Sequence, residues 1–149
     1  MNALTILQSY LDEVGAAVLR GDWNEYEARV CLPFQLVTHT ANLTVTTQGD
    51  LRAGFDAFVQ TLRSQQVTDY IRLAEAAIQL DEALISGRYA THLMVHAHRI
   101  LPPFRSEITL RLEGNRWRAA SITNALANSR WPLLMPSVTD TPDGKGSGQ

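Results

Sequence analysis

Histidine is the residue of this sequence with the widest chemical range near neutral pH, because its unperturbed pKa of about 6.5 lets it carry or release a proton. The chain has four histidines. His39 lies in the segment VTHT, whereas His92, His96 and His98 lie close together in a later stretch. These positions suggest either acid–base chemistry by one histidine or metal binding by several.

The spacing of the later histidines argues against a metal site. On an extended strand, His96 and His98 would lie on one face, about 7 Å apart, and could chelate one ion. His92 is four residues from His96, too far along a strand to join easily, and no carboxylate is nearby in the sequence. Structural zinc usually needs four ligands and catalytic zinc three. We therefore expect no metal, and we interpret these histidines as part of a polar outer face or a dimer surface.

These histidines belong to the stretch 83–100, which is rich in β-branched and aromatic residues and free of proline, and which predicts one long central strand. Side chains alternate between the faces of a strand. One set of alternate positions is core-like and contains Ile85, Tyr89, Thr91, Leu93, Val95 and Ala97. The other set is polar and contains Ser86, Arg88, His92, His96 and His98, with Ala90 and Met94 among them. Because Tyr89 lies on the core-like face, it is a better candidate for a hydrogen-bond donor into a pocket than the residues of the polar face.

Composition limits the classes of function. At 149 residues the chain fits one domain with a real core, and 45% of its residues are hydrophobic. The net charge of −2 predicts no nucleic-acid partner and no attraction to a membrane surface. Cys31 is the single cysteine, so no internal disulfide can form. We see no signal peptide, no membrane span and no nucleotide-binding motif, so we expect a cytoplasmic protein without a cofactor.

Three helices are predicted in the first half of the chain. Leu4, Leu7, Leu11, Val14 and Val18 recur at helical spacing over about 3–19, and Gly21 follows as a cap. Asp22 and Glu25 form a capping pair for a short second helix, which we expect Pro33 to stop. Asp50 can cap a third helix that ends near Gln66, with an apolar stripe of Leu51, Phe55, Phe58, Val59 and Leu62.

The other segments are predicted to be strands. Two short ones cover 34–41 and 43–47, with a tight turn at Ala41-Asn42. Besides the central strand, longer ones cover 69–80, 104–113 and 116–126, and Pro102-Pro103 separates the last two from it. We place a domain at 1–128 and a C-terminal extension at 129–149, whose polar residues 141–149 are expected to be mobile. The apolar segment Trp131–Pro136 is expected to dock on the domain or on a partner subunit.

This order of elements resembles the nuclear transport factor 2-like, or cystatin-like, superfamily. Gly21-Asp22-Trp23 looks like the recurrent joint between the first two helices, the segment 46–58 like the strand-to-helix entry, and LRLEGNRWRAASI at 110–122 like the closing hairpin. The resemblance implies an α+β cone, in which three N-terminal helices pack on a strongly curved, mixed but mostly antiparallel sheet of about six strands. The concave side forms a pocket, and the convex side often makes a homodimer.

The nearest enzymes in this superfamily are SnoaL-like polyketide cyclases and ketosteroid isomerases. The isomerases carry a catalytic carboxylate about sixteen residues after the helix joint, and the same count reaches Thr38-His39 here. The aspartate is absent, so His39 is the nearest group that can carry a proton. The tyrosine donor of the first helix falls near Val14, so that role is unfilled, and ketosteroid isomerase activity is not inferred.

Together these observations predict a SnoaL-like protein with an apolar pocket for a small hydrophobic molecule, acting as an isomerase, cyclase or dehydratase. His39 would be the acid–base group and Tyr89 an orienting donor. The residues expected to line the pocket are Trp23, Val37, Phe55, Phe58 and Trp117. The alternative is a non-catalytic ligand-binding or dimerisation module. A cavity of a few hundred Å³ with His39 in its wall favours the enzyme, whereas aromatic side chains that fill the cavity favour the module.

Overall fold

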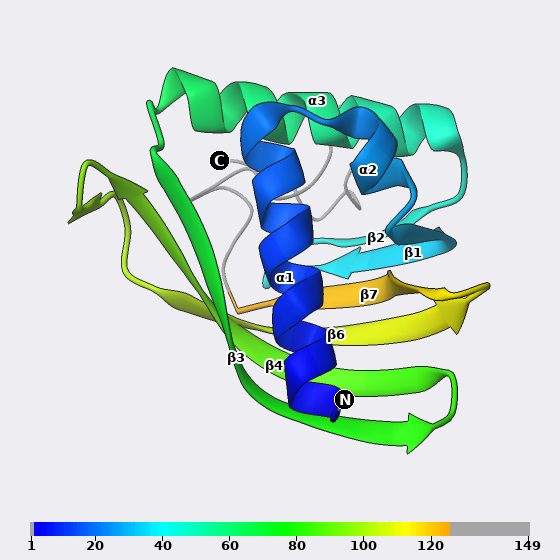
Figure 1. Ribbon diagram of the computed structural model, residues 1–149. Helices are drawn as coiled ribbons and strands as arrows, with labels where there is room; N and C mark the ends of the chain where they lie inside the picture. The colour runs from blue at the N-terminus through cyan, green and yellow to red at the C-terminus, as the bar shows by residue number, and fades with distance from the viewer. Residues whose placement is uncertain (1, 126–149) are drawn as a thin grey trace.

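The computed structural model describes residues 2–125 and arranges them as helices packed against one curved sheet (Figure 1). Three helices are α1 (Ala3–Arg20), α2 (Trp23–Glu27) and α3 (Gln48–Ser64). The strands are β1 (Val30–Val37), β2 (Asn42–Val45), β3 (Asp69–Asp81), β4 (Leu84–Val95), β5 (His98–Arg99), β6 (Phe104–Glu113) and β7 (Arg116–Asn124). The C-terminal extension 129–149 and the segment Trp131–Pro136 lie outside the described residues.

The sheet has the order β2-β1-β7-β6-β4-β3, and the two-residue β5 pairs with β4. The β1–β7 pair is parallel and the other pairs are antiparallel. In Figure 1, α1 runs across the inner face of the sheet, in front of β3 and β4, and α3 closes the top. The predicted α+β fold with a mixed, mostly antiparallel, curved sheet is confirmed.

The helix ends follow from local hydrogen bonds. The Asn2 side chain accepts the backbone N–H of Thr5 at 2.8 Å at the start of α1, and Gly21 ends the helix in a left-handed conformation with φ of 72°. Asp22 accepts the N–H of Glu25, as predicted. For α3, however, the predicted cap is wrong: Thr47 is the N-cap, and its hydroxyl accepts the N–H of Asp50 at 3.1 Å.

The first strand differs from its prediction. We expected α2 to continue to Pro33, but α2 ends at Glu27, and β1 already begins at Val30 and runs through Pro33. A proline inside a sheet cannot donate a ladder hydrogen bond. The register between β1 and β7 shifts between Val30 and Gln35, which accommodates the missing donor.

The long central strand is also shorter than predicted. Alternation is confirmed, since Ile85, Tyr89 and Leu93 are buried on the inner face, but β4 ends at Val95. His96 and Ala97 have φ of 48° and 73° and form a two-residue turn, after which β5 folds back on the end of β4. Positive φ at both central residues suits a tight hairpin. His96 and His98 therefore do not share the face of one extended strand.

Candidate functional site

A cavity of about 100 Å³ lies between α1, α3 and the inner face of the sheet. Its walls are mainly apolar, with Val14 from α1, Phe55 and Phe58 from α3, and Phe34 and Leu93 from the sheet. The amphipathic stripes of the two helices produce this arrangement, because each helix turns its apolar face toward the sheet. The cavity is thus a space in the core that the side chains of α1, α3 and the sheet leave unfilled.

Arg72 of β3 is the only charged side chain among the described residues that line the cavity. It is 6% exposed, and its Nη2 donates to the backbone carbonyl of Leu11 in α1 at 3.3 Å. Its Nε has no hydrogen-bond partner, and no carboxylate among residues 2–125 forms an ion pair with it. A buried charge without a counter-ion is costly, so this guanidinium is the most unusual group of the site.

Tyrosine rings surround the Arg72 guanidinium. Its central carbon lies 5.0 Å from the centroid of the Tyr70 ring and 5.4 Å from that of Tyr89. Burial lowers the pKa of Arg72, but Tyr70, Tyr89 and Tyr10 raise it by more, so the pKa lies above its ordinary value. The side chain therefore stays charged, and cation–π contacts of up to about 2 kcal/mol each offset part of its desolvation.

The phenols at the cavity are protonated near neutral pH. Burial raises the pKa of Tyr10, Tyr26 and Tyr70 above the ordinary value of 10.0. Tyr10 donates its hydroxyl proton to the backbone carbonyl of Arg29 at 2.9 Å. Within residues 2–125, no hydrogen bond forms from the hydroxyl of Tyr26 or of Tyr70, so both remain available as donors to a ligand.

The polar groups of the cavity come from neighbouring strands at matching positions. Thr91 of β4 lies opposite Arg72, and in an adjacent row Tyr89 lies opposite Ser106, which lies opposite Asn124 of β7. Opposite side chains in a sheet are about 5 Å apart, so these residues form one cluster. The Ser106 hydroxyl hydrogen-bonds the Asn124 side-chain oxygen, which leaves the amide nitrogen of Asn124 as a further donor at the cavity.

Three of the residues expected at the pocket do line the cavity. These are Tyr89, Phe55 and Phe58. Trp23, Val37 and Trp117 do not contribute to its wall. Trp23 instead packs on the rings of Tyr26 and Phe55, with centroid distances of 6.2 and 5.5 Å. Trp117 is half-buried, and its carbonyl accepts the Arg29 Nε proton at 3.1 Å.

His39 lies outside the cavity. Because β1 ends at Val37, His39 falls in a turn that the N–H of Thr38 closes by donating to the Ala41 carbonyl at 2.8 Å. Its side chain is exposed and is not part of the cavity wall. The acid–base role of His39 stays a prediction, and this position offers it no direct path to a molecule in the cavity.

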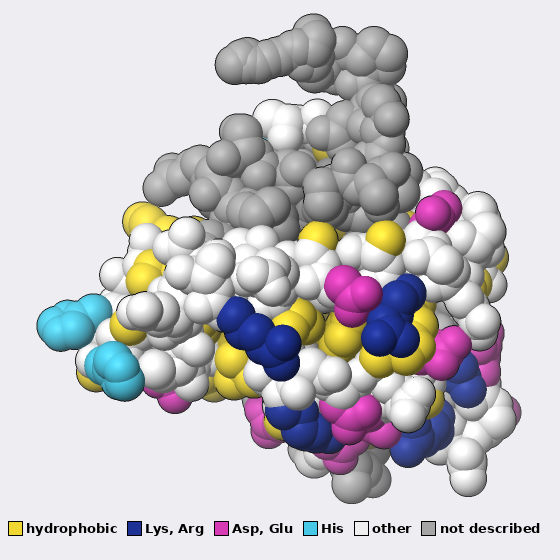
Figure 2. Space-filling view, turned by 90° about the horizontal axis from the view of Figure 1, so that it is seen from above, with side chains coloured by type: hydrophobic (Ala, Val, Ile, Leu, Met, Phe, Trp, Pro, Cys, Tyr) yellow, Lys and Arg dark blue, Asp and Glu magenta, His cyan; other side chains and the backbone are white. Residues whose placement is uncertain are grey.

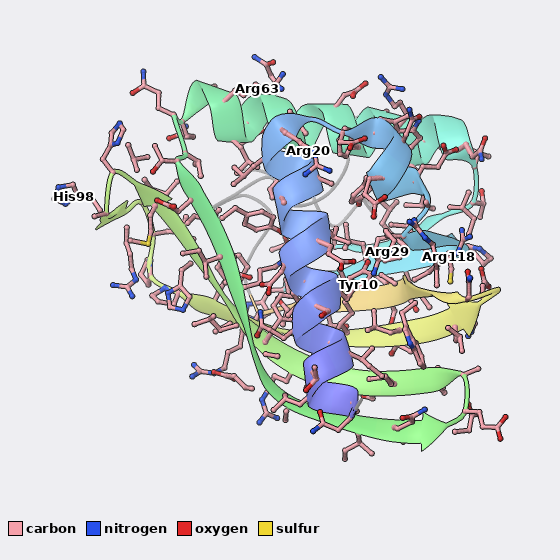
Figure 3. All side chains as sticks on the ribbon, viewed as in Figure 1. Tyr10, Arg20, Arg29, Arg63, His98 and Arg118 are labelled. Carbon is pink, nitrogen blue, oxygen red and sulfur yellow. The ribbon has the colours of Figure 1, made fainter. Side chains whose placement is uncertain are left out.

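The other histidines lie far from the cavity as well. Figure 2 shows histidine side chains at one end of the molecule, and Figure 3 places His98 at the tip of the β4–β5 hairpin, away from Tyr10. The Nδ1 of His92 lies 3.3 Å from the guanidinium of Arg99, which donates to it. Among the residues that the structure describes, no three His, Cys, Asp or Glu side chains gather as a metal site. In the same part of the chain, no helix is long and apolar enough to cross a membrane.

Sequence reasoning did not identify Arg72. In the segment 69–80, Ile71 and Leu73 are the apolar alternate positions, so alternation alone would turn them inward. The structure turns them outward, buries Arg72 and partly buries Tyr70. The available signal was the pair Tyr70 and Arg72 at alternate positions of one strand, which matches a polar, aromatic inner face.

The sequence matches no protein-family model and no curated protein. Solved structures with the same fold are similar at low sequence identity. An NTF-2 like protein of unknown function from Shewanella oneidensis MR-1 has a TM-score of 0.59 and 11% identity, covering 82% of this chain and 98% of that one. An NTF2-like protein of unknown function from Silicibacter pomeroyi DSS-3 has a TM-score of 0.60 and 16% identity, covering 83% and 94%.

A domain of unknown function with a cystatin-like fold from Nostoc punctiforme PCC 73102 has a TM-score of 0.59 and 12% identity, covering 85% of this chain and 79% of that one. These similarities establish the nuclear transport factor 2-like, cystatin-like fold. They indicate no specific activity, because this fold supports many functions and only the residues of the site can distinguish between them.

Proposed function

We propose that this protein binds a small, mainly apolar organic molecule in the cavity between α1, α3 and the sheet. The observation that carries the proposal is an apolar cavity into which a few polar groups converge, led by Arg72. Such a combination is the usual form of a small-molecule site. Its volume of about 100 Å³ is below the range of about 300 to 1,000 Å³ for drug-sized ligands, so the ligand has about the size of one ring or a short branched chain.

Binding without turnover is better supported than acid–base catalysis. No Asp, Glu or His among the described residues lines the cavity, so no conventional proton acceptor is at hand. Phe34, Phe55 and Phe58 occupy much of the space between the layers without closing it. The partly filled cavity is therefore intermediate between the open pocket expected for an enzyme and the filled core expected for a non-catalytic module.

A SnoaL-like isomerase, cyclase or dehydratase is the second candidate, and one observation favours it. Neutral phenols and a buried guanidinium, aimed at one cavity, are the kind of donors that stabilise negative charge developing on a carbonyl oxygen. In such an enzyme the proton acceptor would be a group of the substrate, a water molecule, or His39 after a movement of the turn at 38–41.

Calorimetric titration with neutral single-ring probes, such as toluene and benzyl alcohol, tests the binding function. We expect saturable binding and a raised melting temperature. The variant Val14→Phe fills the cavity from α1 and should abolish binding. Leu4→Phe, at the exposed start of the same helix, is the matched control and should bind as the wild type does. Equal binding by the two variants would place the ligand elsewhere, and the failure of every ring compound, neutral or carboxylate, to bind the wild type would reject the function.

We also propose that the outer face of the sheet forms a homodimer. Four large apolar side chains of β3 are exposed there: Ile71, Leu73, Ile78 and Leu80. The outer face of β4 adds the half-buried Met94 and the exposed Arg88. Glu75 of β3 lies between Arg88 and Arg105 at 3.6 and 3.0 Å. An apolar stripe with charges of both signs is self-complementary, as a two-fold interface requires.

A further inference from the structure

We infer that the ligand of the cavity is a monocarboxylate, whose carboxylate group pairs with the guanidinium of Arg72. This inference rests on the small-molecule function proposed above and specifies its ligand. It starts from a contrast between the two buried arginines of the described chain, Arg29 and Arg72, which are 8% and 6% exposed.

Arg29 is a buried arginine whose charge and donors are satisfied within the protein. Its Nη1 lies 2.7 Å from a carboxylate oxygen of Glu13 and 3.2 Å from one of Glu25, and its Nε donates to the Trp117 carbonyl at 3.1 Å. Figure 3 shows Arg29 beside α1, on the side of β1 and β7. This arrangement is what a purely structural buried arginine requires, namely a counter-ion and filled donors.

Arg72 has neither of these. One carbonyl, that of Leu11, accepts from its Nη2, its Nε has no partner, and no carboxylate pairs with it among residues 2–125. The aromatic rings of Tyr70 and Tyr89 stabilise the charge without neutralising it. The missing element is an anion, and the guanidinium lines the apolar cavity between the helices and the inner face of the sheet.

The charge balance of the cavity selects an anion with a single charge. Arg72 contributes one positive charge, and no other charged side chain of the described residues lines the cavity. A monoanion would leave the site neutral, whereas phosphate, with close to two charges, would place an uncompensated negative charge among apolar side chains. The planar fork of a guanidinium matches the two oxygens of a carboxylate.

The neighbouring donors fit the same ligand. Thr91 lies opposite Arg72 in the sheet. Tyr70 lies on the same inner face of β3 as Arg72, and its hydroxyl stays protonated. These groups can donate to the outer lone pairs of a carboxylate that Arg72 holds. The phenylalanines and Val14 then surround the rest of the molecule, so its body is a single ring or a short branched chain.

The experiment compares ligands of one shape and different charge. Benzoate, benzamide and inorganic phosphate are titrated calorimetrically into the wild-type chain, into Arg72→Met and into Arg63→Met. Arg63 is the matched control, because it is exposed at the end of α3 and does not line the cavity (Figure 3). We expect the wild type and Arg63→Met to bind benzoate at least about tenfold more tightly than benzamide, and phosphate not at all. Arg72→Met should lose this preference and bind benzamide at least as well as benzoate.

Each other outcome has a definite meaning. If benzamide and the neutral ring probes bind but benzoate gains nothing, the carboxylate inference is wrong and the cavity function stands. If phosphate binds as well as benzoate, the site takes anions in general, and the inference is also wrong. If no ring compound binds the wild type, both proposals fail. Should Arg72→Met not fold, Arg72→Lys keeps the charge without the planar fork, and unchanged benzoate affinity in that variant would overturn the bidentate pairing.

Discussion

Gly87 of β4 lies directly beneath Leu7 of α1, so closely that a β-carbon at position 87 would come within 2.6 Å of the Leu7 Cδ2 atom. The carbonyl oxygen of Ala76 in β3 would be 3.1 Å from the same β-carbon. Leu7 is fully buried, so it has no free space into which to move. The absence of a side chain at Gly87 thus allows α1 to approach the sheet closely at this point.

The variant Gly87→Ala should therefore be destabilised by about 1 to 3 kcal/mol, as is usual for an overpacked core. Leu7→Ala should cost about 2 to 5 kcal/mol through the cavity it creates. In the double variant, the added methyl group partly fills that space, so the two penalties should not add. Chemical denaturation of the four proteins measures the coupling, with the exposed Gly49→Ala as a control expected to change stability little. Additivity within about 0.5 kcal/mol would contradict this contact between Leu7 and position 87.

The Tyr10 hydroxyl should contribute to stability through its bond to the Arg29 carbonyl, which also accepts the N–H of Ala119 at 2.9 Å. This carbonyl joins α1 to β7, so Tyr10→Phe should lower the free energy of unfolding by about 1 kcal/mol. Tyr26→Phe is the matched control, because its hydroxyl has no partner within residues 2–125 and its loss should cost less than about 0.5 kcal/mol. Equal effects in thermal or urea denaturation would contradict the assignment.

Alkaline pH should destabilise the fold through its buried phenols. The raised pKa values of Tyr10, Tyr26 and Tyr70 mean that the folded chain keeps protons that the unfolded chain, with an ordinary pKa of 10.0, has released. The contribution of these phenols to the free energy of unfolding is fully present below pH 10. It declines as the pH rises above 10, because the phenols of the unfolded state then ionise while those of the folded state stay protonated. Unfolding curves at increasing pH should show this decline, and Tyr70→Phe should make it shallower. Ionisation of these phenols near pH 10 in a chain that stays folded would refute it.

The outer face of the sheet gives a prediction about assembly. Leu73→Lys places a charge in the apolar stripe of β3 and should convert the proposed homodimer to a monomer. Leu4→Lys is a close control, since Leu4 on α1 is 43% exposed and Leu73 is 49% exposed. Light scattering at micromolar concentration measures the mass of each protein. A monomeric wild type, or a dimer unaffected by Leu73→Lys, would exclude this interface.

The sequence by itself determined the parts of the fold that depend on local periodicity and local hydrogen bonds. The buried stripe of Leu7, Leu11, Val14 and Val18 follows from the turn of a helix, and the buried alternate positions of β4 follow from the pleat of a strand. The cap that Asp22 forms with the N–H of Glu25 is likewise a contact between near neighbours. These features were predictable because each is decided within a few residues of chain.

Only the tertiary structure decided the site. The hydrophobic pattern of the segment 69–80 favours inward positions for Ile71 and Leu73, but α1 lies over the other face of β3. There the Gln8 side chain of α1 donates to the Arg72 carbonyl at 2.8 Å and accepts the Ala74 N–H at 2.8 Å. The side chain of Arg72 is thereby buried beside tyrosines from three other elements, at positions 10, 26 and 89. His39 is left exposed because β1 ends two residues before it. Which face of a strand turns inward depends on the elements that pack over it, and that choice is made between segments about 60 residues apart in the chain, beyond the reach of any local pattern.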